Sequence, residues 1–70
     1  MSNVKLIIED VLGVKINEED GLGTISEWDS MAQFTILLAI EKEFGIKFNI
    51  EELTDVTTLS SCISTTKKKL

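Results

Sequence analysis

Apolar residues recur at helical spacing in several stretches of the chain, and polar or glycine-containing segments separate these stretches. In residues 3–12 the apolar side chains lie three or four positions apart, with Lys5 on the other side. Ser2 or Asn3 can cap the start of this stretch, and Gly13 can end it in a left-handed conformation. The pattern therefore predicts an amphipathic helix over residues 3–12.

The most apolar stretch, residues 30–44, predicts a second helix with Asp29 as its N-cap and Gly45 as its terminator. Apolar residues at helical spacing predict an inward-facing stripe, which consists of Phe34, Leu37, Leu38, Ile40 and Phe44. If Phe34 is a core anchor, its replacement by Ala costs about 3–5 kcal/mol. Met31 and Ile36 widen the apolar arc beyond one face, which leaves two interpretations: a helix buried on several sides, or one that exposes side chains to partners.

Two shorter helical stretches follow. Asn49 and the Glu52 that lies three residues later form a capping box, which predicts a short helix over residues 50–54. Thr57 or Thr58 can cap a last helix. The apolar face predicted there consists of Val56, Leu59, Ile63 and Thr66, with Cys62 beside it.

Residues 17–27 predict a long loop, because turn-forming and acidic residues dominate them. A loop of this length in a small domain needs anchoring, which Leu22, Ile25 and Trp28 can supply by packing over the helices. The whole pattern predicts an all-α fold. We expect a small four-helix bundle of three main helices and one short helix, with the long loop between the first two, in a single domain over residues 1–70.

The charge of the chain indicates the kind of partner it can have. Seven basic and twelve acidic residues give a net charge of −5 over 70 residues. Such a surface repels nucleic acid phosphates and favours partners with basic patches. No run approaches the roughly 18 apolar residues of a membrane span, and the N-terminus lacks a signal-peptide pattern. We therefore expect a cytoplasmic monomer that binds no nucleic acid and does not insert into membranes.

Few residues are suited to catalysis or metal binding. Histidine is absent, which excludes Ser-His-Asp and Cys-His arrangements and imidazole ligands. Cys62 is the single cysteine and is typical of a small core residue. Acidic runs such as Glu18-Glu19-Asp20 are typical of a solvated surface, since paired-carboxylate catalysis needs a cleft for which this chain leaves little room. We predict no catalytic residue and no metal site.

Ser30 has the most distinctive position of any polar residue. It opens the second predicted helix directly after Asp29, where free backbone N–H groups favour an anion. A phosphodiester there gains about 0.3–1 kcal/mol from the helix N-terminus. Because no base is at hand to activate it, the hydroxyl is a weak nucleophile, and Ser30 fits the role of a residue that another enzyme modifies.

A resemblance to the acyl carrier protein family is carried by two motifs, Trp28-Asp29-Ser30-Met31 and Ile40-Glu41-Lys42-Glu43-Phe44-Gly45-Ile46, and it extends over essentially the whole chain. The resemblance implies a 4'-phosphopantetheine arm on Ser30, taken from coenzyme A by a phosphopantetheinyl transferase, with Asp29 as the motif partner. The arm would carry acyl or aminoacyl groups as thioesters from a loading ligase or transferase to downstream synthases. We expect partners to dock on Met31, Gln33, Ile36 and Glu41.

The sequence also departs from the carriers of bacterial fatty acid synthesis, which usually place acids at several exposed positions of the second helix. Here no charge follows Met31 until Glu41. In having a tryptophan before Asp29, the sequence is similar to carriers of specialised pathways, including D-alanyl, polyketide and peptidyl carriers. We therefore expect a stand-alone carrier dedicated to one pathway. The alternative is a small helical adaptor that binds a partner through its apolar second helix.

Overall fold

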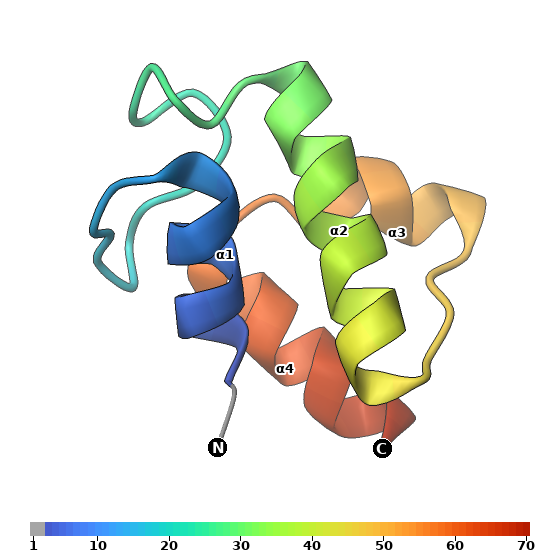
Figure 1. Ribbon diagram of the computed structural model, residues 1–70. Helices are drawn as coiled ribbons and strands as arrows, with labels where there is room; N and C mark the ends of the chain where they lie inside the picture. The colour runs from blue at the N-terminus through green and yellow to red at the C-terminus, as the bar shows by residue number, and fades with distance from the viewer. Residues whose placement is uncertain (1–2) are drawn as a thin grey trace.

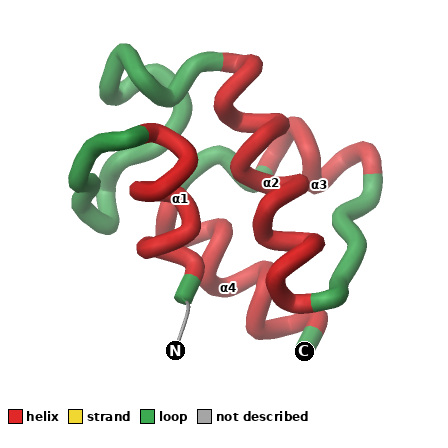
Figure 2. The backbone as a smooth tube through the Cα atoms, in the orientation of Figure 1, coloured by secondary structure: helices red, strands yellow, loops and turns green. Residues whose placement is uncertain are grey.

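The computed structural model describes residues 3–70, which form four helices joined by loops (Figures 1 and 2). In chain order, the helices are α1 (Val4–Leu12), α2 (Ser30–Phe44), α3 (Ile50–Asp55) and α4 (Leu59–Lys69). The part of the chain that the structure describes contains no strand. The predicted all-α fold, with three main helices, one short helix and a long loop before α2, is confirmed.

The helix boundaries follow from capping residues. The side chain of each N-cap accepts a hydrogen bond from the backbone N–H three residues later, and these caps are Asn3, Asp29, Asn49 and Thr58. Both α1 and α2 end at a glycine in the left-handed region, with φ of +74° at Gly13 and +67° at Gly45. The predicted ends of these helices are confirmed, while Ser2, the other candidate cap of α1, lies outside the described residues.

The core lies where α1, α2 and α4 meet. α1 packs against both α2 and α4, and α3 packs against α2, as Figure 1 shows. The largest fully buried side chains are Ile8, Trp28, Ile36, Leu37, Ile40, Leu59 and Cys62. No residue of α3 is fully buried, and this short helix packs against the core through the partly buried Leu53. Cys62 is a core residue as predicted, and burial raises the pKa of its thiol to about 12.

The inward face of α2 differs from the predicted stripe. Leu37 and Ile40 are fully buried, but Phe34 and Leu38 are 51% and 48% exposed. The helix carries two overlapping stripes at helical spacing, and the one that faces the core consists of Gln33, Ile36, Leu37 and Ile40. The prediction that Phe34 faces the core is therefore wrong, and the condition for a loss of about 3–5 kcal/mol on its truncation is not met.

The long loop between α1 and α2, green in Figure 2, is held by backbone hydrogen bonds and by the packing of Trp28 and Ile25 in the core. The N–H of Leu22 donates to the carbonyl oxygen of Thr57 (2.8 Å), and the N–H of Leu59 donates to that of Asp20 (3.0 Å). These bonds flank an isolated antiparallel bridge between positions 21 and 58. Of the expected anchors, Trp28 is fully buried, whereas Leu22 is exposed. The loop is thus fixed to the α3–α4 junction.

Candidate functional site

Ser30 is the first residue of α2, and its side chain is exposed. Asp29 holds the helix start, because its Oδ1 accepts from the N–H of Ala32 (2.9 Å) and its carbonyl oxygen accepts from that of Gln33 (2.8 Å). The N–H groups of the first two helical residues are then left to face the solvent in front of the helix. Their partial positive charge favours an anion at the Ser30 hydroxyl.

The segment that leads to Ser30 is fixed by Trp28, two residues earlier. The Trp28 side chain is fully buried, and its Nε1–H donates to Oε1 of Gln33 (2.8 Å). Its backbone N–H donates to the carbonyl oxygen of Ile25 (3.2 Å), and its own carbonyl oxygen accepts from the N–H of Gly23 (3.1 Å). The exposed hydroxyl of Ser30 is therefore attached to a well-anchored stretch of backbone.

A groove of about 400 Å³, with Ser30 among its lining residues, lies between α2 and α3. Its lining is mostly apolar and consists of Leu22, Ser30, Gln33, Phe34, Ile50, Leu53 and Thr54. Such a groove suits an apolar chain attached at Ser30, because the walls can remove part of that chain from water.

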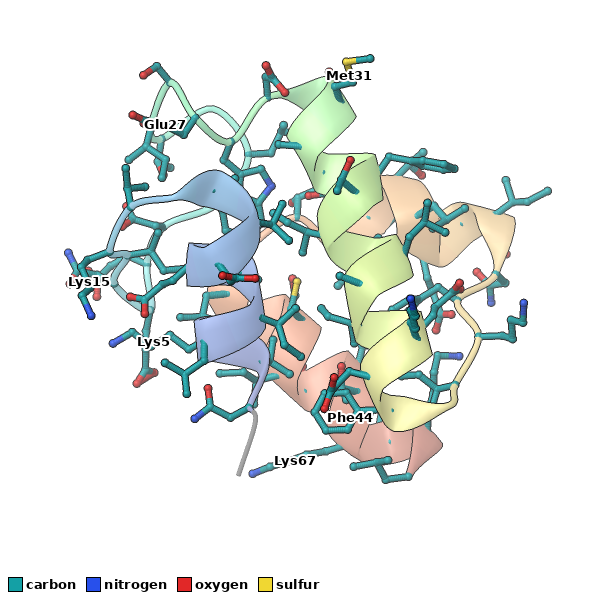
Figure 3. All side chains as sticks on the ribbon, viewed as in Figure 1. Lys5, Lys15, Glu27, Met31, Phe44 and Lys67 are labelled. Atoms are coloured by element: carbon teal, nitrogen blue, oxygen red, sulfur yellow. The ribbon has the colours of Figure 1, made fainter. Side chains whose placement is uncertain are left out.

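The four residues predicted to dock partners do not share one surface. Met31 is 81% exposed and projects away from the body at the start of α2 (Figure 3). Gln33 and Ile36 are buried, so the prediction that they contact partners is wrong: both lie on the α2 stripe that faces the core. Glu41 is partly buried, and its Oε2 accepts from the N–H of Phe48 (2.7 Å), which ties the end of α2 to the segment before α3.

Sequence reasoning missed two exposed apolar residues, Phe34 and Leu38. Together with Met31 they follow the spacing of one helical face, and we call these three residues the outer α2 face. The sequence shows the same spacing, but Phe34 and Leu38 also fit the stripe predicted to face the core. Figure 3 shows the start of this face at Met31, on the same end of α2 as Ser30.

Two kinds of feature are absent from the described residues. Within residues 3–70, the structure contains no group of three or more Cys, Asp and Glu side chains that could hold a metal ion. Among the same residues, no helix has the length and apolar character that crossing a bilayer requires.

The exposed serine at a capped helix start, on a four-helix body with an adjacent apolar groove, is the arrangement expected of a carrier domain. Residues 3–64 match the family model described as the phosphopantetheine attachment site, a match that includes α1, α2 and α3 entire. The chain belongs to this family, and the resemblance to acyl carrier proteins is confirmed. A search of curated proteins found no match.

Domains of this family carry 4'-phosphopantetheine in covalent linkage. The site fits that group: the Ser30 hydroxyl is accessible, the helix start favours a phosphodiester, and the groove can receive the apolar part of a cargo. Carrier domains of the family are not catalytic by themselves, and they interact with phosphopantetheinyl transferases and biosynthetic enzymes.

Proposed function

We propose that this protein is an acyl carrier protein that tethers acyl or aminoacyl intermediates to a 4'-phosphopantetheine arm on Ser30 and presents them to biosynthetic enzymes. The observation that carries the proposal is the exposed Ser30 side chain at the first position of α2, in a chain of the phosphopantetheine attachment family. The terminal thiol of the arm supplies the thioester chemistry, and the protein itself catalyses no reaction.

The residues around Ser30 have distinct roles in this function. The Ser30 oxygen bonds to the phosphorus of coenzyme A that carries the pantetheine, the pyrophosphate bond breaks, and adenosine bisphosphate leaves. A phosphopantetheinyl transferase removes the serine proton, since this chain has no histidine to do so. Asp29 keeps the first turn of α2 closed by accepting from the N–H of Ala32. The two N–H groups left in front of the helix stabilise the phosphodiester charge by about 0.3–1 kcal/mol.

Partner enzymes dock on the outer α2 face, which replaces the predicted set that included Gln33 and Ile36. Support comes from the exposure of Met31, Phe34 and Leu38 on the helix that begins with Ser30. An exposed apolar stripe of this kind marks a contact surface. No charged residue occurs from Met31 to Ile40, so docking rests on apolar contact more than on ion pairs. This character supports a carrier dedicated to a specialised pathway.

The groove between α2 and α3 shelters part of the loaded arm. Its apolar wall includes Phe34 from α2 and Leu53 from α3, and Ser30 is part of the same lining. A cargo with an apolar portion is stabilised there by about 25 cal/mol for each Å² of apolar surface removed from water.

Intact-protein mass spectrometry tests the proposal directly. The purified protein is incubated with coenzyme A, magnesium and a broad-specificity transferase, beside Ser30→Ala and the control Ser26→Ala, which changes an exposed serine of the preceding loop. We expect the wild type and Ser26→Ala to gain the mass of one phosphopantetheine group and Ser30→Ala to gain none. No gain on the wild type, or an equal gain on Ser30→Ala, contradicts the function.

The second candidate function is a helical adaptor that binds a partner through the outer α2 face. The exposure of Met31, 81% for a large apolar side chain, favours it. An adaptor requires no modification, so Ser30→Ala leaves the complex intact whereas Met31→Glu abolishes it. The carrier function instead requires the Ser30 hydroxyl for every later step.

A further inference from the structure

The side chain of Gln33 is the one buried amide next to the modification site in the described residues, and it bonds at both ends. Its Oε1 accepts from Nε1–H of Trp28 (2.8 Å). Its Nε2 donates to the carbonyl oxygen of Val56 (2.5 Å) and to that of Leu53 (3.4 Å). The residue itself is only 5% exposed. A buried amide with both ends paired fixes the positions of its partners.

Only one orientation of the Gln33 amide satisfies these partners. The indole nitrogen of Trp28 can only donate, so it must face the amide oxygen. The carbonyl oxygen of Val56 can only accept, so it must face the amide nitrogen. The chemistry of the two partners therefore assigns the amide, and a flipped side chain would leave both buried groups unpaired.

Through these bonds Gln33 joins Trp28, five residues before it in the chain, to Leu53 and Val56, which lie 20 and 23 residues after it. Trp28 lies in the long loop. Gln33 is the fourth residue of α2 and faces the core, and Val56 is the C-cap residue of α3. Because α3 has no buried residue, the bonds from Nε2 are a tie between the end of α3 and the interior of α2. Ser30 lies between Trp28 and Gln33 in the chain, and α3 forms the far wall of its groove.

We propose that Gln33 is a positioning residue for the modification of Ser30. By holding Trp28 on one side and the end of α3 on the other, it sets the place of the Ser30 hydroxyl relative to the surface on which the transferase docks. This inference rests on the proposed attachment of the arm at Ser30. Gln33 does not itself touch the reacting atoms, and its effect passes through Trp28 and the first turn of α2.

The positioning role predicts different effects on the KM and the kcat of the transferase. Gln33 faces the core, whereas Met31, Phe34 and Leu38 face outward, so a change at Gln33 leaves the docking residues in place. The Michaelis constant of the transferase for this protein is then nearly unchanged, while kcat falls because the hydroxyl is misplaced in the docked complex. General destabilisation would not give this separation as long as the variant is folded at the assay temperature.

The test uses Gln33→Met, which keeps the length of the side chain but removes both hydrogen-bonding ends, and Trp28→Phe, which removes only the indole donor. The control is Cys62→Ala, which truncates a fully buried side chain of α4 outside this network. We expect kcat to fall roughly tenfold in Gln33→Met and less in Trp28→Phe, with KM within about twofold of wild type. In Cys62→Ala, assayed where it is equally folded, both constants stay near wild type.

A second measurement follows the hydrogen bond itself. Trp28 is the sole tryptophan, so the indole N–H gives one identifiable resonance in a proton–nitrogen spectrum of the unmodified protein. We expect slow solvent exchange of this proton in the wild type and in Cys62→Ala, and fast exchange in Gln33→Met.

Several results overturn the inference. These are a kcat in Gln33→Met and Trp28→Phe no lower than in Cys62→Ala, a raised KM with unchanged kcat, or an indole proton that exchanges as slowly in Gln33→Met as in the wild type. A wild-type protein that is never modified overturns the proposed function and this inference together. A modified wild type with normal kcat in Gln33→Met overturns only the role of Gln33.

Discussion

A Cβ atom added to Gly21 would lie 2.3 Å from the carbonyl oxygen of Thr57 and 2.9 Å from the Cα of Thr58. The backbone of the long loop approaches that of the α3–α4 junction closely here, and Cγ2 of the Thr58 side chain also lies 2.9 Å from the added atom. The two hydrogen bonds on either side of Gly21, from Leu22 to Thr57 and from Leu59 to Asp20, depend on this approach.

Replacing Gly21 by Ala therefore forces the two backbones apart. We expect Gly21→Ala to lower the free energy of unfolding by about 1–3 kcal/mol, as measured by urea denaturation. The control Glu19→Ala changes an exposed residue of the same loop and should stay within about 0.5 kcal/mol of wild type. A Gly21→Ala protein with wild-type stability would show that the loop does not meet the junction as the structure has it.

Truncations on the two faces of α2 should lower the free energy of unfolding by different amounts. Phe34 is half exposed, so Phe34→Ala should cost less than about 1.5 kcal/mol. Leu37 is fully buried, and Leu37→Ala should cost about 2–5 kcal/mol. Urea denaturation of both variants gives the comparison, and the reverse order would place the core on the other side of α2.

The same Phe34→Ala variant tests the docking surface. As a member of the outer α2 face, Phe34 should contribute to the KM of the transferase, which we expect to rise several-fold with little change in kcat. Glu43→Gln, which changes an exposed residue near the C-terminal end of α2 outside that face, serves as the control. Equal KM values for the two variants would remove Phe34 from the docking surface.

The Glu52 carboxylate predicts a dependence of stability on pH. The ion pair with Lys69 (Nζ to Oε1, 2.8 Å) lowers the pKa of Glu52, and the hydrogen bond from the N–H of Asn49 adds to the effect. Since the folded-state pKa lies below the unfolded one, the stabilisation is present above the unfolded pKa and is lost as the pH falls through the folded pKa.

Glu52→Gln removes this contribution. We expect the difference in Tm between wild type and Glu52→Gln to be largest near neutral pH and to shrink in acid. Glu51→Gln, which changes the exposed carboxylate one position earlier, should show a smaller difference. A difference for Glu52→Gln that grows as the pH falls would contradict the sign derived from its pKa.

The burial of Cys62 determines whether a thiol reagent labels this side chain or only the thiol of the arm. Its pKa is raised to about 12 by burial, so at pH 8 the folded protein presents almost no thiolate at this position. We expect a thiol reagent to leave the folded, unmodified protein unlabelled and to label it once in denaturant. After phosphopantetheinylation, one labelled thiol per folded chain should appear. Rapid labelling of the unmodified protein would show that Cys62 is accessible.

The helix boundaries could be predicted because each depends on residues close together in the sequence. Asn3, Asp29 and Thr58 accept from backbone groups three positions away, and Gly13 and Gly45 supply the left-handed ends. For the same reason the position of Ser30 at a helix start was predictable. Its role as the attachment residue is a prediction for mass spectrometry to test.

The inward face of α2 could not be predicted from periodicity, because the helix is apolar over most of its circumference. Hydrophobicity favoured Phe34 and Leu38 over the polar Gln33, yet Gln33 is buried. The decisive factors are the two partners of its amide, Trp28 and Val56, and Val56 lies 23 residues further along the chain. The contact between Gly21 and Thr57 is likewise a long-range approach of two backbones, which no side-chain pattern records.

Because Ser30 and the outer α2 face belong to one uninterrupted helix, their separation follows from helix geometry. At about 1.5 Å per residue, the axial span from Ser30 to Leu38 is about 12 Å, and no hinge lies between them. Under the proposed function, α2 fixes the distance between the outer α2 face and the base of the arm. Every enzyme that docks on Met31, Phe34 and Leu38 then finds the base of the arm at the same distance along the helix. Unrelated enzymes can therefore place their active sites at one common distance from their docking surfaces.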